Sequence, residues 1–114
     1  MVVVIVNEET MSDKNWFDLV NEVHDQYFDL DGVKFDSVSG EFRLPFGSNR
    51  KEPYNERELV VVGVNSIAID DEARIRYYVL LDLSLDTKGR EIVIVATALK
   101  ITLSVQSGWE ITIR

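Results

Sequence analysis

Apolar residues recur at three- and four-residue spacing over residues 12–30, which is typical of an amphipathic helix. Ser12 is placed to cap the N-terminus, and Gly32 stands where a left-handed C-terminal residue is expected. The pattern therefore predicts one helix of about five turns, at ~3.6 residues per turn. The apolar positions are Trp16, Phe17, Leu19, Val20, Val23, Tyr27, Phe28 and Leu30.

From residue 33 the apolar period changes to two, as expected for strands. A two-residue turn at Ser39 and Gly40 predicts a hairpin over residues 33–46, with Pro45 at a strand end or an edge. The predicted cross-strand pairs are Val33 with Phe46, Phe35 with Leu44, and Asp36 with Arg43.

Residues 47–57 lack an apolar period and predict the longest loop, whereas residues 58–69 predict a buried strand with a bulge at Gly63. After an acidic turn at 70–73, residues 74–85 alternate. We expect Ile75, Tyr77, Val79, Leu81, Leu83 and Leu85 to face the core, and Arg74, Arg76, Tyr78, Leu80, Asp82 and Ser84 to face mostly solvent.

The C-terminal quarter changes apolar parity, which predicts a bulge or sharp bend near residues 96–99. A three-residue loop at 106–108, with Gly108 left-handed, would form a final hairpin that sets Val105 against Trp109. The same register sets Leu103 against Ile111 and Ile101 against Ile113.

These elements predict an α+β fold: one long N-terminal helix packed on a bent antiparallel meander of about six strands. We expect one domain over residues 1–114. Residues 1–10 are either an extension or contain an edge strand at 2–6, and the strand is favoured because exposed aliphatic residues would be sticky. The arrangement resembles cystatin-like folds, but the Q-x-V-x-G loop of cystatins is absent, so protease inhibition is not implied.

The chain has 46% apolar and 28% charged residues and a net charge of -8, which is a globular and acidic composition. Such a surface repels nucleic acid and anionic lipid. Its one basic cluster, Arg50, Lys51 and Arg57, is diluted by three glutamates. We therefore expect no nucleic-acid or membrane partner.

Cysteine is absent, which excludes disulfides, thiolate metal sites and cysteine nucleophiles. The opening MVVVIV lacks the basic flank and the length of a signal peptide, and no segment reaches the length of a membrane span. A cytoplasmic location is the expectation, with no cofactor.

His24, the one histidine, is followed by Asp25, but adjacent helical residues lie ~100° apart around the axis. On that geometry the two residues are not a dyad: His24 faces the sheet between Phe17, Val20 and Phe28, while Asp25 faces solvent. A hydrogen-bonded structural histidine is favoured over a catalytic one.

Other reactive motifs are missing. The DLDG stretch fails as a calcium loop because Tyr27 and Val38 fall at the key ligand positions, and one histidine cannot supply a multi-histidine metal site. No G-x-S-x-G, P-loop or G-x-G-x-x-G sequence occurs. The chain is therefore expected to be non-enzymatic, with no metal site.

Residues 24–46 resemble a pattern in small bacterial proteins of unknown function, some of them toxin-immunity-like. The matching residues are His24, Asp25, Val33, Phe35, Asp36, Gly40, Phe42, Leu44 and Phe46. The resemblance implies a protein that acts by binding a partner protein.

The leading hypothesis is therefore protein–protein interaction, through the sheet face that includes Leu80 or through the 47–57 loop. The candidate surface residues are Arg50, Lys51, Tyr54, Arg74, Arg76 and Tyr78. The alternative is a ligand-binding or weakly catalytic pocket between helix and sheet, lined by His24, Tyr77 and Trp109. A third possibility is a homodimer formed by pairing of sheets.

Overall fold

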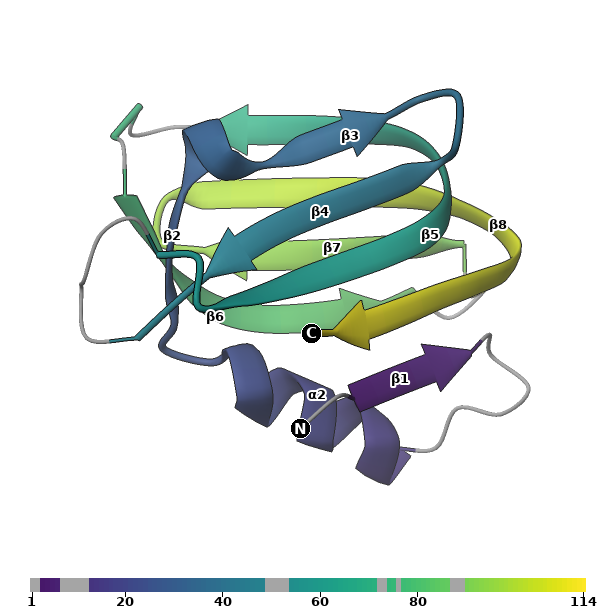
Figure 1. The fold of residues 1–114 in the computed structure, drawn as a ribbon, viewed down its shortest axis with the longest axis horizontal. Coiled ribbons are helices and arrows are strands. Elements are labelled where there is room, and N and C mark those ends of the chain that lie inside the picture. Colours follow the sequence, from purple (N-terminus) through teal and green to yellow (C-terminus); the bar gives the residue numbers. More distant parts are fainter. Residues whose placement is uncertain (1–2, 7–12, 49–53, 72–73, 76, 87–89) are drawn as a thin grey trace.

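Strands dominate the fold (Figure 1). The computed structural model describes residues 3–6, 13–48, 54–71, 74–75, 77–86 and 90–114. The elements are β1 (Val3–Val6), α2 (Asp13–Val23), β2 (Tyr27–Asp29), the 3-10 turn η1 (Leu30–Gly32), β3 (Lys34–Asp36), β4 (Glu41–Phe46), β5 (Arg57–Asp71), β6 (Tyr77–Leu85), β7 (Glu91–Ala96) and β8 (Leu99–Ile113).

Within the described residues the strands form one curled antiparallel sheet, in the order β2-β6-β7-β8-β5-β4-β3, with β1 paired to β8. The curl brings β2, at one end of this order, beside β4, the last strand but one at the other end, because Tyr27 in β2 exchanges backbone hydrogen bonds of 2.7 and 2.9 Å with Gly47 just after β4. The result is a half-barrel with α2 and β1 lying along one side (Figure 1). The predicted architecture of a long helix on a six-stranded meander is therefore wrong, although the strand expected near the N-terminus is present.

The helix ends at Val23, seven residues earlier than predicted, and the Ser12 cap lies outside the described residues. Asp25 has a left-handed φ of 65°, which turns the chain out of the helix and into β2. Phe28 is fully buried there and stacks on Tyr78 of β6, with ring centroids 5.5 Å apart. Spacing alone misled because the apolar residues at 27, 28 and 30 fit a helical stripe, whereas the sheet buries Phe28 in a strand.

The predicted hairpin is present as β3–β4, but the predicted register is wrong. Phe35 lies opposite Phe42, and Asp36 opposite Glu41. The Asp36 carboxylate accepts hydrogen bonds from the amides of Val38 (2.9 Å) and Ser39 (3.3 Å), which closes a longer turn and lowers the pKa of Asp36 below its usual value. The shift preserves side-chain parity, so the apolar face is unchanged.

Arg43, the predicted partner of Asp36, instead bonds to two glutamates. Its guanidinium donates to Glu41 and, at 2.6 Å, to Glu58 on β5. The hydrogen bond to Glu41 and then the charge of Glu58 raise the pKa of Arg43. Arg43 of β4 therefore forms its ion pair across strands with Glu58 of β5, and not with Asp36 of β3 as predicted.

The C-terminal hairpin is also absent: β8 runs unbroken through residues 106–108 and pairs with β5 on both sides of them. Val61 lies opposite Ile111, and Ile69 opposite Ile101. Gly108 has the predicted left-handed backbone, with a φ of 86°, although it lies within a strand and not in a loop. The bulge predicted at Gly63 is confirmed, because the register shifts beside it and its φ is 82°. The two glycines lie where the β5–β8 pairing is irregular, and both strands curve along their length in Figure 1.

The parity change near residue 96 comes from a hairpin turn, and not from a bulge or sharp bend within one strand as predicted. Ala96 pairs directly with Leu99, so β7 turns back into β8 through a two-residue connection, in which Ala98 has a φ of 55°. A hairpin reverses the chain, and the parity change in the sequence is the trace of that reversal.

The two faces of β6 are exchanged relative to the prediction over its first half. Tyr78 and Leu80 are fully buried, whereas Ile75 and Leu81 are 49% and 38% exposed. An irregularity between Leu80 and Asp82 then restores the expected face, so that Leu83 is buried. Both faces of this stretch carry large apolar residues, so alternation identified the strand without identifying its inner side.

Candidate functional site

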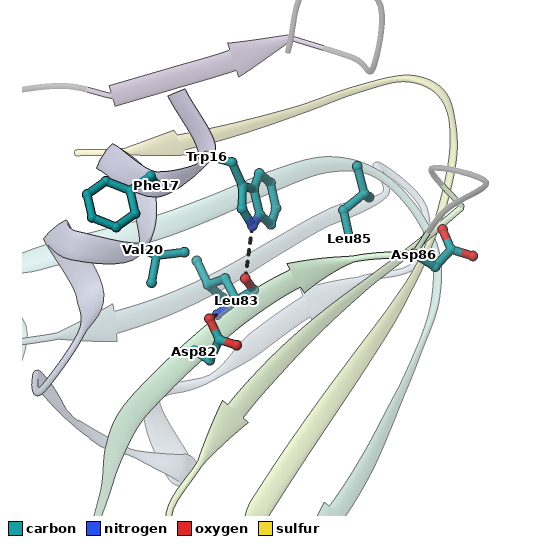
Figure 2. A pocket seen from close by; sticks show the side chains of 7 residues that line it. All are labelled: Trp16, Phe17, Val20, Asp82, Leu83, Leu85 and Asp86. Atoms are coloured by element: carbon teal, nitrogen blue, oxygen red, sulfur yellow. Dashed lines mark hydrogen bonds between the residues drawn. The ribbon is translucent and has the colours of Figure 1, made fainter. Parts of the chain in front are cut away.

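An apolar groove of about 590 Å³ lies between α2 and β6 (Figure 2). Its lining residues are Trp16, Phe17, Val20, Asp82, Leu83, Leu85 and Asp86. Helical spacing produces one wall, because Leu19 and Val23 are buried against the sheet while Phe17 and Val20 fall on the flank of the same helix. The groove is therefore the line along which the short helix meets the sheet.

Phe17 is the most exposed of the groove's apolar side chains, with 64% of its surface accessible. Its ring stands on the outer side of α2, away from the other lining side chains of the helix (Figure 2). Neighbouring Trp16 is half-buried and donates its indole N–H to the carbonyl of Leu83 at 2.9 Å. Trp16 thus holds the helix on β6, while Phe17 presents apolar surface that the fold leaves uncovered.

Two aspartates supply the charge of the groove. Asp82 is exposed, and its carboxylate accepts the backbone amide of Leu83 at 2.8 Å. The Asp86 carboxylate accepts the amides of Arg90 and Glu91 at 2.7 and 3.1 Å. Figure 2 shows the two carboxylates at opposite ends of the stretch formed by Leu83 and Leu85. The lining is therefore apolar with a negative charge at each end.

His24 lies just beyond α2, where the helical geometry used in the sequence argument no longer holds. Its side chain is 51% exposed, and its Nδ1 lies 3.0 Å from the carbonyl of Leu81, to which it donates. Nε2 is 3.5 Å from the carboxylate of Asp25, so the two residues do approach each other. The inward orientation predicted for His24 is wrong because the chain leaves the helix at Asp25.

Tyr77 and Trp109 lie in different surroundings from His24. Tyr77 packs edge-on against Tyr54, with ring centroids 5.3 Å apart, and Tyr54 stacks on Tyr27. Trp109 is fully buried at the β5–β8 bend, where its Cα is close to Gly63, and its indole N–H has no hydrogen-bond partner among the described residues. None of the three predicted pocket residues lines the α2–β6 groove or the depression between Leu30 and Arg74.

Of the residues proposed from sequence as an interaction surface, those that the structure describes do not form a shared exposed face. Tyr78 is fully buried and Tyr54 is 5% exposed, so neither offers contact area. Leu80 is buried as well, because the faces of β6 are exchanged. Arg74 is exposed, whereas Arg50, Lys51 and Arg76 lie outside the described residues.

A second depression of about 360 Å³ is lined by Leu30, Asp31, Asp71, Arg74 and Ile75. Tyr78 bonds to two of these lining residues: its hydroxyl is 2.7 Å from the Asp71 carboxylate and 2.6 Å from the carbonyl of Ile75. Burial, and next the hydrogen bond and charge of Asp71, raise the pKa of Tyr78 to about 12. The phenol is held neutral here and serves to tie the β5–β6 connection together.

Tyr78 should make the fold sensitive to alkali. Because its pKa in the folded protein is about 12 and the usual value is about 10, the stabilisation is complete below pH 10 and is lost as the pH rises through 12. The expected loss is about 2–3 kcal/mol. Urea denaturation at several pH values should show a smaller alkaline loss for Tyr78→Phe than for the parent chain. Parallel curves for the two proteins would contradict this assignment.

The sequence does not predict the groove, because its lining residues fit the pattern of a buried core. The sequence pattern predicts that Trp16, Phe17, Val20 and Leu83 lie in the core and that Asp82 faces solvent. One signal was available: adjacent helical residues such as Trp16 and Phe17 diverge by ~100°, so a narrow buried stripe cannot cover both rings. The spacing of apolar residues along the sequence does not show that β6 lies beside the flank of the helix.

Two further properties concern the described part of the chain. None of its helices has both the length and the apolar character needed to cross a membrane. Over the same residues, no three histidine, aspartate or glutamate side chains are grouped so that they could hold a metal ion.

Comparisons of the chain with protein-family models, with curated proteins and with solved structures gave no match.

Proposed function

We propose that this chain is a non-enzymatic domain that binds a partner protein through the α2–β6 groove. The observation that carries the proposal is Phe17, a large apolar side chain left 64% exposed at the margin of the groove that Trp16, Val20 and Leu85 also line. Covering such a side chain contributes about 1–2 kcal/mol, and aromatic residues of this kind are typical anchors of interfaces.

Charge narrows the class of partner. Asp82 and Asp86 at the groove and a net charge of -8 over the chain favour a partner that carries lysine or arginine. The same charges disfavour nucleic acid and anionic lipid. The proposal places the protein in the cytoplasm and involves no cofactor.

The alternative of a ligand pocket centred on His24 has less support. His24 already donates to the Leu81 carbonyl, lies at the surface, and is separate from the lining of the groove. A general base needs a cleft that positions a substrate against it. The geometry therefore favours a structural role for His24 at the end of α2.

The test compares two exposed apolar positions. Phe17→Ser should weaken the affinity for the physiological partner by about 30-fold. Val38→Ser, at a turn position that is 96% exposed, should leave it unchanged. The readout is affinity capture from a lysate of the source organism, followed by titration of the captured protein.

Folding must be the same in the two variants, which a melting curve establishes. A captured protein that binds Phe17→Ser as tightly as the parent chain would overturn the proposal. A molar mass that doubles with concentration, and reverts in Phe17→Ser, would replace the partner with a second copy of the chain.

A further inference from the structure

Over the described residues, the groove runs along the part of the β6 edge that β2 leaves unpaired. Asp86 donates its amide to the Glu91 carbonyl across the β6–β7 pair at 3.0 Å, so the pair Asp86–Glu91 is hydrogen-bonded. Antiparallel pairs alternate between hydrogen-bonded and non-hydrogen-bonded. The backbone groups of Leu85 and Leu83, which lie opposite Ile92 and Ile94, therefore point away from β7 and towards the groove.

Over the described residues, the neighbouring strand on this side stops short of the groove. β2 pairs with β6 only at Tyr77–Val79, and the last backbone contacts are made by Leu80, with Gln26 and Asp25. Beyond this point β6 continues to Leu85 beside α2.

Side chains occupy the first part of this edge. The carbonyl of Leu81 accepts from His24, the carbonyl of Leu83 accepts from Trp16, and the amide of Leu83 donates to Asp82. Such capping is a common way to shield a strand edge. Leu85 lies one step further, at the end that is lined by Asp86.

The outer and inner faces of this edge differ in chemistry. Asp82, Ser84 and Asp86 alternate with Leu83 and Leu85, so the carboxylates share one face of the strand and the leucines share the other. A neighbouring strand would place its own side chains in the same alternation. Basic residues would then lie beside Asp82 and Asp86, and apolar residues beside Leu83, Leu85 and the Trp16 ring.

We propose that the partner enters the groove as an extended segment that adds a strand to β6 at Leu85 and, by displacing the Asp82 carboxylate from the Leu83 amide, at Leu83. This segment carries lysine or arginine on one face and apolar residues on the other. This inference rests on the proposed function, and it adds the conformation and the sequence pattern of the segment that binds. Main-chain hydrogen bonds would supply affinity, and the aspartates would supply register and selectivity.

A second copy of the chain fits the edge less well. Each copy carries a net charge of -8, and two copies would bring acidic surfaces together. A basic, alternating segment meets the aspartates with opposite charge, which is the reason to prefer a partner of that composition.

The probe is a short peptide that alternates lysine with isoleucine, capped at both ends, and it is compared in two N-methylated forms. One form is methylated at the lysine amides and the other at the isoleucine amides, so the side chains and the number of methyl groups are matched. In a strand, alternate amides point in opposite directions. Strand addition therefore predicts that one form loses affinity by about tenfold or more and that the other binds nearly as well as the parent peptide.

Binding is followed by the fluorescence of Trp16 and by hydrogen exchange of the Leu85 amide, which should become protected. Asp82→Asn with Asp86→Asn should weaken binding about fivefold, because asparagine keeps the oxygen that accepts the backbone amides and removes only the charge. The matched control is Asp70→Asn with Glu110→Gln, two exposed carboxylates that do not line the groove, and it should have little effect.

The outcomes separate the two proposals. If both methylated peptides bind alike and Phe17→Ser weakens both, strand addition is wrong and the groove remains the binding site. If Phe17→Ser leaves peptide binding unchanged, the groove is not the site, and both proposals fail. Equal losses in the Asp82/Asp86 and the Asp70/Glu110 variants would reduce the binding to non-specific charge attraction and overturn the inference.

Discussion

Phe28→Ala should lower the free energy of unfolding by about 4 kcal/mol. Phe28 is fully buried, and its ring stacks on that of Tyr78 at 5.5 Å inside the curled sheet. Removing it leaves a cavity that a closely packed interior fills only in part. Chemical denaturation of the variant and the parent chain measures the difference directly.

Phe17→Ala is the matched control, since it makes the same change in side chain on the exposed flank of α2. With 64% of its surface already accessible, Phe17 should contribute less than about 1 kcal/mol to folding. Similar losses for the two variants would contradict the placement of residues 27–29 in a buried strand. Together the pair separates a residue that holds the fold from one that is available to a partner.

Gly63→Ala should destabilise the fold by about 3–4 kcal/mol. A side chain at this left-handed position costs about 1–2 kcal/mol. The added Cβ would also lie 3.0 Å from the Cα of Trp109 on β8, where the backbone must move to accept it. Thermal and urea denaturation should both show the loss.

Gly108→Ala isolates the conformational part of that cost. Gly108 has a similar φ of 86°, but an added Cβ would meet nothing within 4 Å. Its loss should stay near 1–2 kcal/mol. If Gly63→Ala cost no more than Gly108→Ala, the close approach of β5 and β8 at the bend would be disproved.

Local patterns identified strands well and their partners poorly. The alternation over residues 74–85 predicted β6, and the turn signals around residue 40 predicted the β3–β4 hairpin. Register needed further information: Asp36 accepts two turn amides in place of a bond to Arg43, and this choice depends on Glu58, which is fifteen residues away from Arg43. Competing hydrogen bonds of similar strength cannot be ranked from spacing.

The candidate groove shows the same division. Its residues were recognised as an apolar helix face and an alternating strand, yet their meeting depends on where α2 ends and where β2 stops pairing with β6. Asp25 sets the first of these points through its left-handed backbone, a conformation that no residue pattern required. A site between two elements can be located only when it is known where each element ends.

Taken alone, the sequence determined an acidic, cysteine-free chain with strands at β3 to β6, apolar alternation over the residues of β7 and β8, a helix beginning near residue 13, a bulge at Gly63 and a left-handed Gly108. These follow from side-chain periodicity and backbone sterics, which are local. The tertiary structure decided the length of the helix, the buried face of β6, the continuity of β8 and the α2–β6 groove. Each of those depends on which distant strand supplies the hydrogen bonds and the apolar surface, and many pairings satisfy the same local pattern.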